Sequence, residues 1–218
     1  MGKVATKHEF ATPQTVNLIM DTTYFGRRFG VMVLYDGISG QALSVDEVKS
    51  ETNALYFEAV CKIREKGINI QSITCDGKKG LIQMFADIPV QLCHFHQVKT
   101  VNRYLTRKPK TAAAQDLREL VLTLKNNNRL QFESALNGWF ERHKSFLNER
   151  TVNPETGKSH YTHKRLRSTC NSLKRNLNYL FAFECFPELN IPQTTVAGRS
   201  FWGYEAETAL SSGYEKRE

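Results

Sequence analysis

The sequence lacks several features that mark well-known classes of protein. No apolar run comes near the roughly 20 residues that a membrane-spanning helix requires, and residues 1–14 are mixed and polar, unlike a secretory signal. The chain also has no Gly-x-Gly-x-x-Gly, no P-loop and no Gly-x-Ser-x-Gly motif, which argues against a dinucleotide-binding protein, a P-loop NTPase and a serine hydrolase. Its five cysteines include no Cys-x-x-Cys pair. We therefore expect reduced thiols in a cytoplasmic protein without a membrane partner.

The composition is that of a folded protein with a basic surface. Hydrophobic residues make up 40% of the 218 residues and charged residues 24%, which allows one core with an appended subdomain. Lys and Arg outnumber Asp and Glu by 30 to 22, which gives a net charge of +8. This charge favours an acidic partner, nucleic acid ahead of a membrane surface, and nothing in the sequence indicates a small-molecule substrate.

The first half of the chain alternates strand-like and helix-like runs. Three β-rich runs in sequence predict an antiparallel meander, and the strand, helix, strand order after it predicts a crossover that makes the fourth strand parallel to an earlier one. A fifth strand and the start of a helix follow. The expected fold is therefore α/β, with a mixed five-stranded sheet and flanking helices. The expected strands are residues 15–24, 28–35, 41–45, 68–77 and 90–93, and the expected helices 50–66, 81–86 and 97–105.

The second half has helical spacing and no strand signal. Residues 112–126, 130–149 and 162–186 are expected to be helical, with a polar turn at 151–158. The last helix carries Lys164, Arg165 and Arg167 among leucines. Such a basic face is either a solvated surface or a surface for phosphates, and the overall charge favours the second interpretation.

Two acids follow strand-like runs, Asp21 after Asn17–Met20 and Asp76 after Ile68–Cys75. Functional groups collect at the carboxyl ends of strands in sheets of this kind, and Mg²⁺ prefers oxygen ligands on a rigid support. Two such carboxylates could share divalent metal ions for phosphoryl transfer. The alternatives are a polar residue that closes an edge strand at Asp21 and an ordinary Asp-Gly turn at Asp76.

Two further segments are candidates for supporting roles. Cys93 and His96 lie three residues apart, but no companion pair completes a zinc site. We expect Cys93 to pack behind the site and His96 to bond an acid or contact DNA. Arg107, Lys108 and Lys110 form a compact basic segment that either contacts a phosphate backbone or is an exposed linker.

Four segments together resemble the catalytic region of insertion-sequence transposases of the Mutator-like type. They read Leu-Ile-Met-Asp-Thr-Thr-Tyr-Phe, Ile-Thr-Cys-Asp-Gly-Lys-Lys-Gly, Gln-Leu-Cys-His-Phe-His-Gln and Leu-Thr-Arg-Lys-Pro-Lys. The resemblance implies a ribonuclease H-like fold with an all-helical insertion. It also implies a DDE mechanism, in which Asp21 and Asp76 are the first two acids and bind Mg²⁺ or Mn²⁺, with Cys93 and His96 as a supporting Cys-x-x-His pair.

The resemblance also implies the partners and the division of the chain. The partners would be DNA, as transposon ends and target, and a second copy in a homodimer, in a bacterial-type cytoplasm. Residues 1–14 would be a lead-in, 15–110 the ribonuclease H-like core, 111–186 the helical insertion and 187–218 the end of the core with an aberrant tail. The family's N-terminal DNA-binding module has no counterpart in the sequence, so we expect a chain truncated at its N-terminus.

The third acid of a DDE triad is missing from its expected place. Family members carry it in an Asn-x-x-Glu-Gly segment after a stretch like Ile191–Thr195, where this chain has Arg199. If the codons after Thr195 are shifted by one base, they permit Ser-Leu-Glu-Gly, so we hypothesise a frameshift at or before Val196, followed by a loosely ordered tail. The substitutes that the chain offers lie in other contexts: Glu184, Glu188, Glu205 and Glu207.

The sequence thus predicts a transposase catalytic domain that cleaves and joins DNA strands, altered at its C-terminus. One alternative is a non-catalytic DNA-binding remnant, which would bind DNA with salt sensitivity but without metal dependence or cleavage. Another is a ribonuclease H-like nuclease that acts on RNA:DNA hybrids without end joining.

Overall fold

A mixed sheet of five strands forms the centre of the computed structural model, which describes residues 15–26 and 28–195. The strand order is β3-β2-β1-β4-β5. The first three strands pair antiparallel, whereas β4 pairs parallel with β1 and β5 parallel with β4. The expected mixed five-stranded α/β sheet is therefore confirmed, and its order and directions are those of a ribonuclease H-like fold. The strands are β1 (Thr15–Phe25), β2 (Phe29–Asp36), β3 (Ala42–Val48), β4 (Asn69–Cys75) and β5 (Val90–Leu92).

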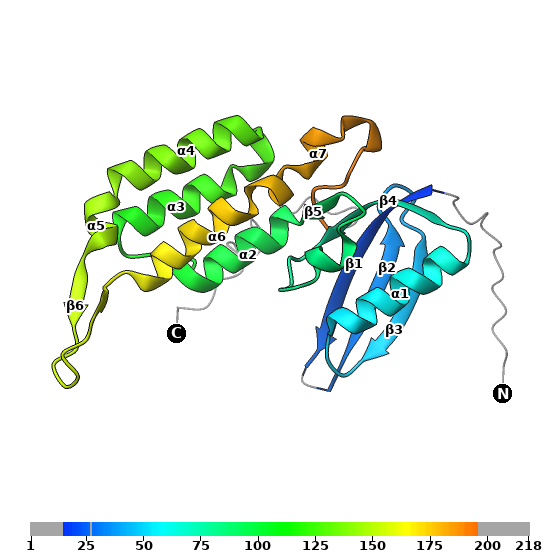
Figure 1. Cartoon of the computed structure of the whole chain (residues 1–218), viewed down its shortest axis with the longest axis horizontal. Helices are drawn as coiled ribbons and strands as arrows, with labels where there is room; N and C mark the ends of the chain where they lie inside the picture. Colours follow the sequence, from blue (N-terminus) through cyan, green and yellow to red (C-terminus); the bar gives the residue numbers. More distant parts are fainter. Residues whose placement is uncertain (1–14, 27, 196–218) are drawn as a thin grey trace, which may run out of the picture.

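One face of the sheet is apolar and is covered by α1 (Asn53–Glu65) (Figure 1). Leu18 and Met20 alternate along β1 toward this face, and they share a core cluster with Tyr56 and Ile63 of α1. The helix begins where the Thr52 side chain accepts a hydrogen bond from Leu55 N, an N-cap that satisfies one free amide. Burial of this amphipathic face fixes α1 against the sheet.

The other face contains buried polar side chains that bind the backbone of a distant segment. Asn17 Nδ2 donates to Leu189 O at 2.7 Å, and Thr74 Oγ1 donates to Pro192 O at 2.7 Å. Gln91 Nε2 donates to Leu180 O at 2.8 Å. Because buried polar groups need partners, these contacts hold residues 189–193 across the sheet and bring the chain back to the core.

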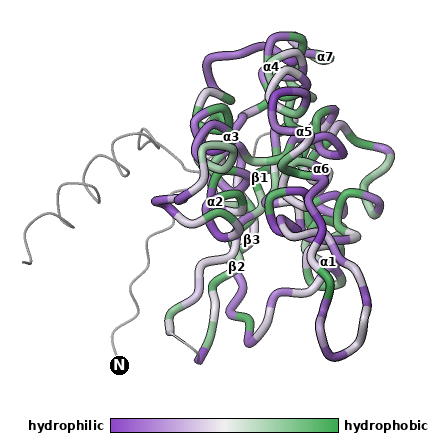
Figure 2. Tube along the Cα trace, turned by 90° about the vertical axis from the view of Figure 1, so that its left-hand side faces the viewer, coloured by the Kyte–Doolittle hydropathy of each residue, from purple (hydrophilic) through white to green (hydrophobic). Residues whose placement is uncertain are grey.

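The second half of the described chain is a layer of helices beside the sheet (Figure 1). Buried side chains of these helices belong to the same core cluster as those of the sheet, and Trp139 Nε1 donates to Ala113 O at 2.9 Å across two of them. The helices are α2 (His94–Leu105), α3 (Ala112–Leu122), α4 (Arg129–Arg142), α5 (Lys144–Asn148), α6 (Lys164–Leu180) and α7 (Ala182–Cys185). Short 3₁₀ turns lie at Ile82–Phe85, Leu124–Asn126 and Pro187–Leu189. Hydrophobic and hydrophilic stretches alternate along these helices, as expected when one face of each is buried (Figure 2).

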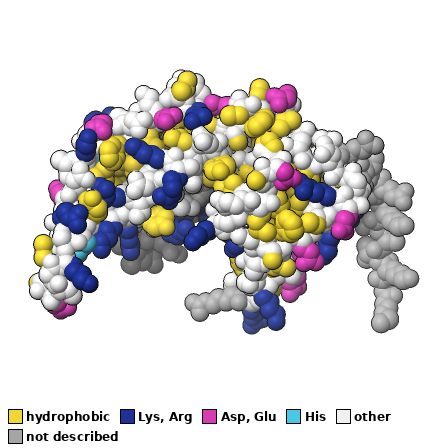
Figure 3. Space-filling model, viewed as in Figure 1, with side chains coloured by type: hydrophobic (Ala, Val, Ile, Leu, Met, Phe, Trp, Pro, Cys, Tyr) yellow, Lys and Arg dark blue, Asp and Glu magenta, His cyan; other side chains and the backbone are white. Residues whose placement is uncertain are grey.

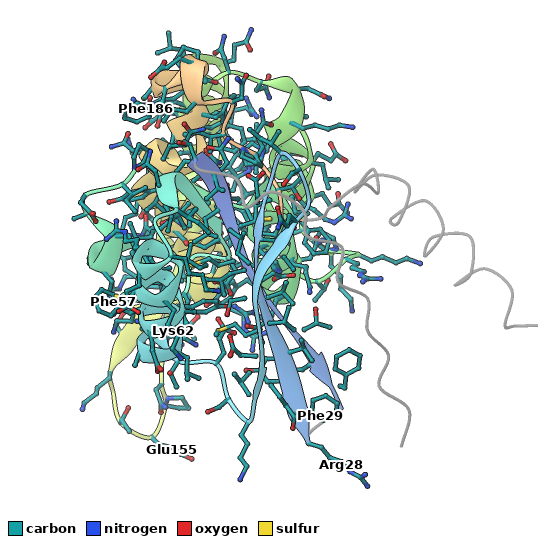
Figure 4. All side chains as sticks on the ribbon, turned by 90° about the vertical axis from the view of Figure 1, so that its right-hand side faces the viewer. Arg28, Phe29, Phe57, Lys62, Glu155 and Phe186 are labelled. Carbon is teal, nitrogen blue, oxygen red and sulfur yellow. The ribbon has the colours of Figure 1, made fainter. Side chains whose placement is uncertain are left out.

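Two details of the helical block differ from the expectation. The stretch 130–149 is two helices, α4 and α5, and a hairpin of β6 (Arg150–Val152) and β7 (Ser159–Tyr161) interrupts the helices (Figure 4, with Glu155 near its tip). The polar turn expected at 151–158 is shorter, because Thr151 and Val152 belong to β6, which pairs with β7 on the other side of the turn. Asn153 Oδ1 accepts from Glu155 N and Thr156 N, which closes the turn and sets the hairpin.

The surface and the thiols agree with the composition. Lys and Arg side chains are numerous over the helical half on the face shown in Figure 3. All five cysteines are free. Within residues 15–26 and 28–195, no helix is both long and apolar enough to cross a bilayer. The expected lead-in, the frameshift at Val196 with its loosely ordered tail, Arg199, Glu205 and Glu207 lie outside the described residues.

Candidate active site

The two acids meet at one edge of the sheet. Asp76 directly follows β4, and Asp21 lies two residues beyond Ile19, the last residue of β1 that pairs with β4. Contrary to the expectation, Asp21 is not at the end of its strand, because Thr22–Phe25 continue to pair with β2. It lies instead where the parallel pairing with β4 ends. That position keeps Asp21 beside Asp76 while the continued β1–β2 pairing holds its backbone rigid.

The electrostatics of Asp21 reflect this neighbourhood. Burial raises the pKa of Asp21, and the charge of Asp76 raises it further. His96 opposes both, since its Nε2 lies 3.9 Å from Asp21 Oδ1. The net result is a pKa above the ordinary value of 3.8. A carboxyl group whose pKa is raised by burial and by a second carboxylate is typical of a functional site. A bound cation would offset both the burial of the negative charge and the repulsion between the two carboxylates.

Asp76 is held by a turn that needs glycine. Lys78 N donates to Asp76 Oδ1 at 3.0 Å, so the Asp-Gly turn considered from the sequence is present. Gly77 has φ +81°, and a Cβ there would lie 2.9 Å from Leu92 Cδ2. Only glycine combines this backbone with that close approach. The turn and the candidate site are compatible, because the turn fixes one carboxylate oxygen and orients the exposed second one.

Cys93 and His96 form a polar pair beside Asp21. Burial raises the pKa of the Cys93 thiol, but hydrogen bonding to His96, the charge of His96 and the Thr195 amide, whose N lies 3.2 Å from Sγ, outweigh it and lower the pKa. Burial lowers the pKa of His96, but hydrogen bonding to Cys93 and the charges of Cys93, Asp21 and Asp76 outweigh it and raise the pKa. The two side chains therefore shift each other's pKa in opposite directions, that of Cys93 down and that of His96 up, beside the carboxylates.

Glu51 is the site residue that sequence reasoning missed. Burial is the largest cause that raises the pKa of Glu51, and the charges of Asp76 and Asp21 add to it, so the three carboxylates lie in one neighbourhood. Its Oε1 is buried without a hydrogen-bond partner, with Lys78 Nζ at 3.9 Å. The sequence contains a signal that could have identified Glu51. In a three-stranded meander β3 runs parallel to β1, so an acid shortly after β3 reaches the same edge as Asp21.

The basic residues expected to bind DNA divide into three groups. Lys110, Lys164 and Arg165, far apart in sequence, line one cleft of about 460 Å³ near the end of α2. Arg167 is occupied: its Nη1 donates to Leu147 O at 3.0 Å and to Asn148 Oδ1 at 2.9 Å, and its guanidinium lies 3.8 Å from the Tyr161 ring centroid. Those contacts give Arg167 a structural role at the base of the hairpin. Arg107 and Lys108 lie exposed in the loop after α2.

The substitutes for the third acid that lie in the described residues have other partners. Both carboxylate oxygens of Glu184 accept from Arg129 N, at 3.0 and 3.2 Å, so this side chain caps the start of α4. Glu188 lies in the turn Pro187–Leu189, where its carbonyl accepts from Asn190 Nδ2. No contact described for Glu184 or Glu188 involves Asp21.

The donor set suits a magnesium-like ion only in part. Mg²⁺ is commonly held by one or two carboxylates together with substrate phosphates and water, and Asp21 and Asp76 could supply those carboxylates. The described residues contain no group of three His, Cys, Asp or Glu side chains arranged to hold a metal ion by themselves. A metal at this edge would therefore depend on phosphate oxygens for the rest of its coordination shell.

Comparisons with known proteins give distant structural similarity only. No family model and no curated protein matches the chain. Similar solved structures include the HTLV-2 integrase catalytic core domain in complex with magnesium, in a dimeric form. It is 18% identical, the match covers 72% of this chain and 97% of that chain, and the TM-score is 0.30.

A second similar structure is the simian T-cell lymphotropic virus intasome in complex with PP2A regulatory subunit B56 gamma. It is 12% identical over 74% of this chain and 48% of that chain, with a TM-score of 0.29. Similarities at these TM-scores support no inference about function. The fold class depends on the strand order and directions described above.

Proposed function

We propose that this chain contains the catalytic core of a DDE transposase of the Mutator-like type, which cleaves DNA strands and transfers their ends. The observation that carries the proposal is the meeting of Asp21 and Asp76 at the carboxyl edge of the sheet, where their charges interact. In this proposal residues 15–110 are the core and 111–186 the insertion. DNA is the substrate, a homodimer is the working form, and the cytoplasm is the compartment.

The residues of the site divide the work. Bound Mg²⁺ or Mn²⁺ would activate a water or a 3′-hydroxyl and stabilise the leaving oxygen. Asp21 and Asp76 would bind the metal. His96 Nε2 lies 3.9 Å from Asp21 Oδ1, where it would attract that carboxylate. Burial lowers the pKa of His96, but hydrogen bonding to Cys93 helps to raise it above its ordinary value.

The test is divalent-metal-dependent nicking of supercoiled DNA. We expect nicking activity with Mg²⁺ or Mn²⁺. Asp21→Asn and Asp76→Asn should each reduce this activity on the order of 100-fold, because loss of a direct metal ligand should cost at least as much as loss of an outer-shell partner. Asp46→Asn, at an exposed site on β3, is the matched control and should retain activity. Equal nicking by all four proteins would sink the proposal.

A second candidate function is DNA binding without catalysis. It is favoured by the absence, among the described residues, of a three-ligand metal group. This candidate predicts DNA binding that weakens with salt, is indifferent to Mg²⁺ and is unaffected by Asp76→Asn, with no nicking.

A further inference from the structure

A basic cleft runs from the candidate active site along α2. It has a volume of about 510 Å³ and shares two residues, Asp76 and His96, with the site. We call it the α2 cleft. Its basic lining residues are Lys78, Lys79, Lys99 and Arg103. None of these four was singled out from the sequence, because they belong to two separate segments, the loop after β4 and the helix α2.

The charge of the α2 cleft is strongly unbalanced. Four cationic side chains line it, and Asp76 is the one acid among its lining residues. Lys78 forms an ion pair with Glu51, with Nζ 3.9 Å from Oε1, so its charge is partly balanced by an acid outside the cleft lining. Lys99 Nζ lies 5.2 Å from the Phe95 ring centroid, and its charge lowers the pKa of Asp21, so Lys99 also faces an acid of the candidate site. Arg103 lies 5.7 Å from the Tyr104 ring centroid. Such a cleft attracts an anion.

The floor of the α2 cleft offers a hydrogen-bond donor. Gln97 is buried, with 6% of its surface exposed, and lines the cleft. Its Oε1 accepts from Asn176 Nδ2 at 3.2 Å, whereas its Nε2 has no partner. An unpaired buried donor costs free energy.

The size and the neighbours of the cleft define the ligand further. Its volume lies within the range of about 300–1,000 Å³ of small-ligand pockets, which suits a nucleotide unit of one strand rather than the width of a duplex. Arg103 lines the α2 cleft, and the next residue, Tyr104, lines the second cleft with Lys110 and Lys164. The two clefts thus form successive positions along the end of α2.

We propose that the α2 cleft binds the phosphate backbone of a single DNA strand next to the phosphate that lies at Asp21 and Asp76. The strand would run along α2 toward the second cleft. This inference rests on the proposed function, since it assigns the path by which the strand leaves that site. A free mononucleotide shares the phosphate chemistry, so the test must separate the two ligands.

The test measures binding of a fluorescently labelled 12-nucleotide single strand by anisotropy, in chelator and at several salt concentrations. We expect Lys99→Gln/Arg103→Gln to weaken binding about tenfold or more, and to reduce the slope of log K against log salt by about 1.4, or about 0.7 for each lost phosphate contact. Lys62→Gln/Lys66→Gln on α1 removes the same charge away from the cleft. This control should change binding less than threefold.

A second variant tests the floor of the cleft. Gln97→Met keeps the length of the side chain and removes the unpaired donor together with the acceptor of Asn176 Nδ2, so we expect weaker binding of the strand, and thermal unfolding shows whether the variant stays folded at the assay temperature. A deoxynucleoside monophosphate should compete only at concentrations far above the Kd of the strand. The proposal is overturned if both cleft variants bind the strand as the α1 control does, or if the mononucleotide competes as well as the strand.

The chelator separates this test from that of the proposed function. Binding through the α2 cleft without any metal-dependent nicking would refute catalysis and leave the binding site standing. Nicking that depends on Asp21 and Asp76 but is unchanged in the cleft variants, with unchanged binding, would refute the cleft alone.

Discussion

Asp21→Asn should make the protein more stable while it removes metal binding. The pKa of Asp21 is raised in the folded state, first by burial and then by Asp76. A carboxyl group with a raised pKa binds its proton more tightly in the folded chain than in the unfolded chain. Its contribution to folding is therefore favourable at low pH, and it is lost as the pH rises from 3.8 through the folded value. At neutral pH the ionised carboxylate opposes folding.

Asparagine keeps the shape of the side chain and cannot ionise. Relief of strain at a functional site commonly stabilises a protein by about 0.5–2 kcal/mol. A change of 1 kcal/mol shifts Tm by about 2–4 °C for a chain of this length. We therefore expect Asp21→Asn to raise Tm by about 1–8 °C at pH 7 in chelator, and to lose that advantage as the pH falls through the folded pKa of Asp21 to 3.8 and below.

With bound metal, the natural sequence should have a higher Tm than Asp21→Asn. A ligand at 100 times its Kd stabilises the folded state by about 2.7 kcal/mol, which corresponds to a rise in Tm of about 5–11 °C for the natural sequence. Asp21→Asn should show little of that rise with Mn²⁺. The assay is thermal unfolding followed by circular dichroism, with and without Mn²⁺, and Asp46→Asn on β3 is the control.

Two results would refute this reasoning. If Asp21→Asn lowers Tm at pH 7 in chelator, the attraction of His96 at 3.9 Å outweighs burial and repulsion, and the site is not electrostatically strained. If Mn²⁺ raises Tm equally in both proteins, Asp21 is not a metal ligand, whatever its pKa.

The remaining predictions concern the surroundings of the site. Cys93→Ala removes the hydrogen bond and the charge that raise the pKa of His96, so NMR titration should give a lower pKa for that ring; an unchanged value would mean that the two side chains do not interact. Glu51→Gln should weaken the apparent Mn²⁺ affinity about tenfold, as for an outer-shell partner, and equal affinity would exclude Glu51 from the site. Gln91→Leu leaves Phe183 N without its acceptor and removes one of two side chains that bind Leu180 O, so it should lower the free energy of unfolding by about 1–3 kcal/mol in urea denaturation, where an unchanged value would contradict the contacts described. Glu184→Ala should cost about 0.5–1 kcal/mol through the lost helix cap and leave nicking intact, whereas loss of nicking at unchanged stability would make Glu184 the third acid.

Much of the sheet and half of the site could be predicted from the sequence. Strand and helix periodicities are local signals, so the five strands and the helix after the meander were expected in the correct order. The same logic located Asp21 and Asp76 at one edge, because parallel strands end together. The extension of β1 past Asp21 was not foreseen, since pairing with β2 alone decides where that strand ends.

The tertiary structure alone decided which distant residues share a surface. Lys99 and Arg103 join Lys78 in one cleft because α2 packs beside the loop after β4. The buried polar residues of the sheet, which period-two patterns do not explain, find partners 89 or more residues later, as Gln91 does at Leu180 O and Thr74 at Pro192 O. Local sequence fixes the strands and the acids that follow them, whereas contacts at long separation depend on how the finished elements pack.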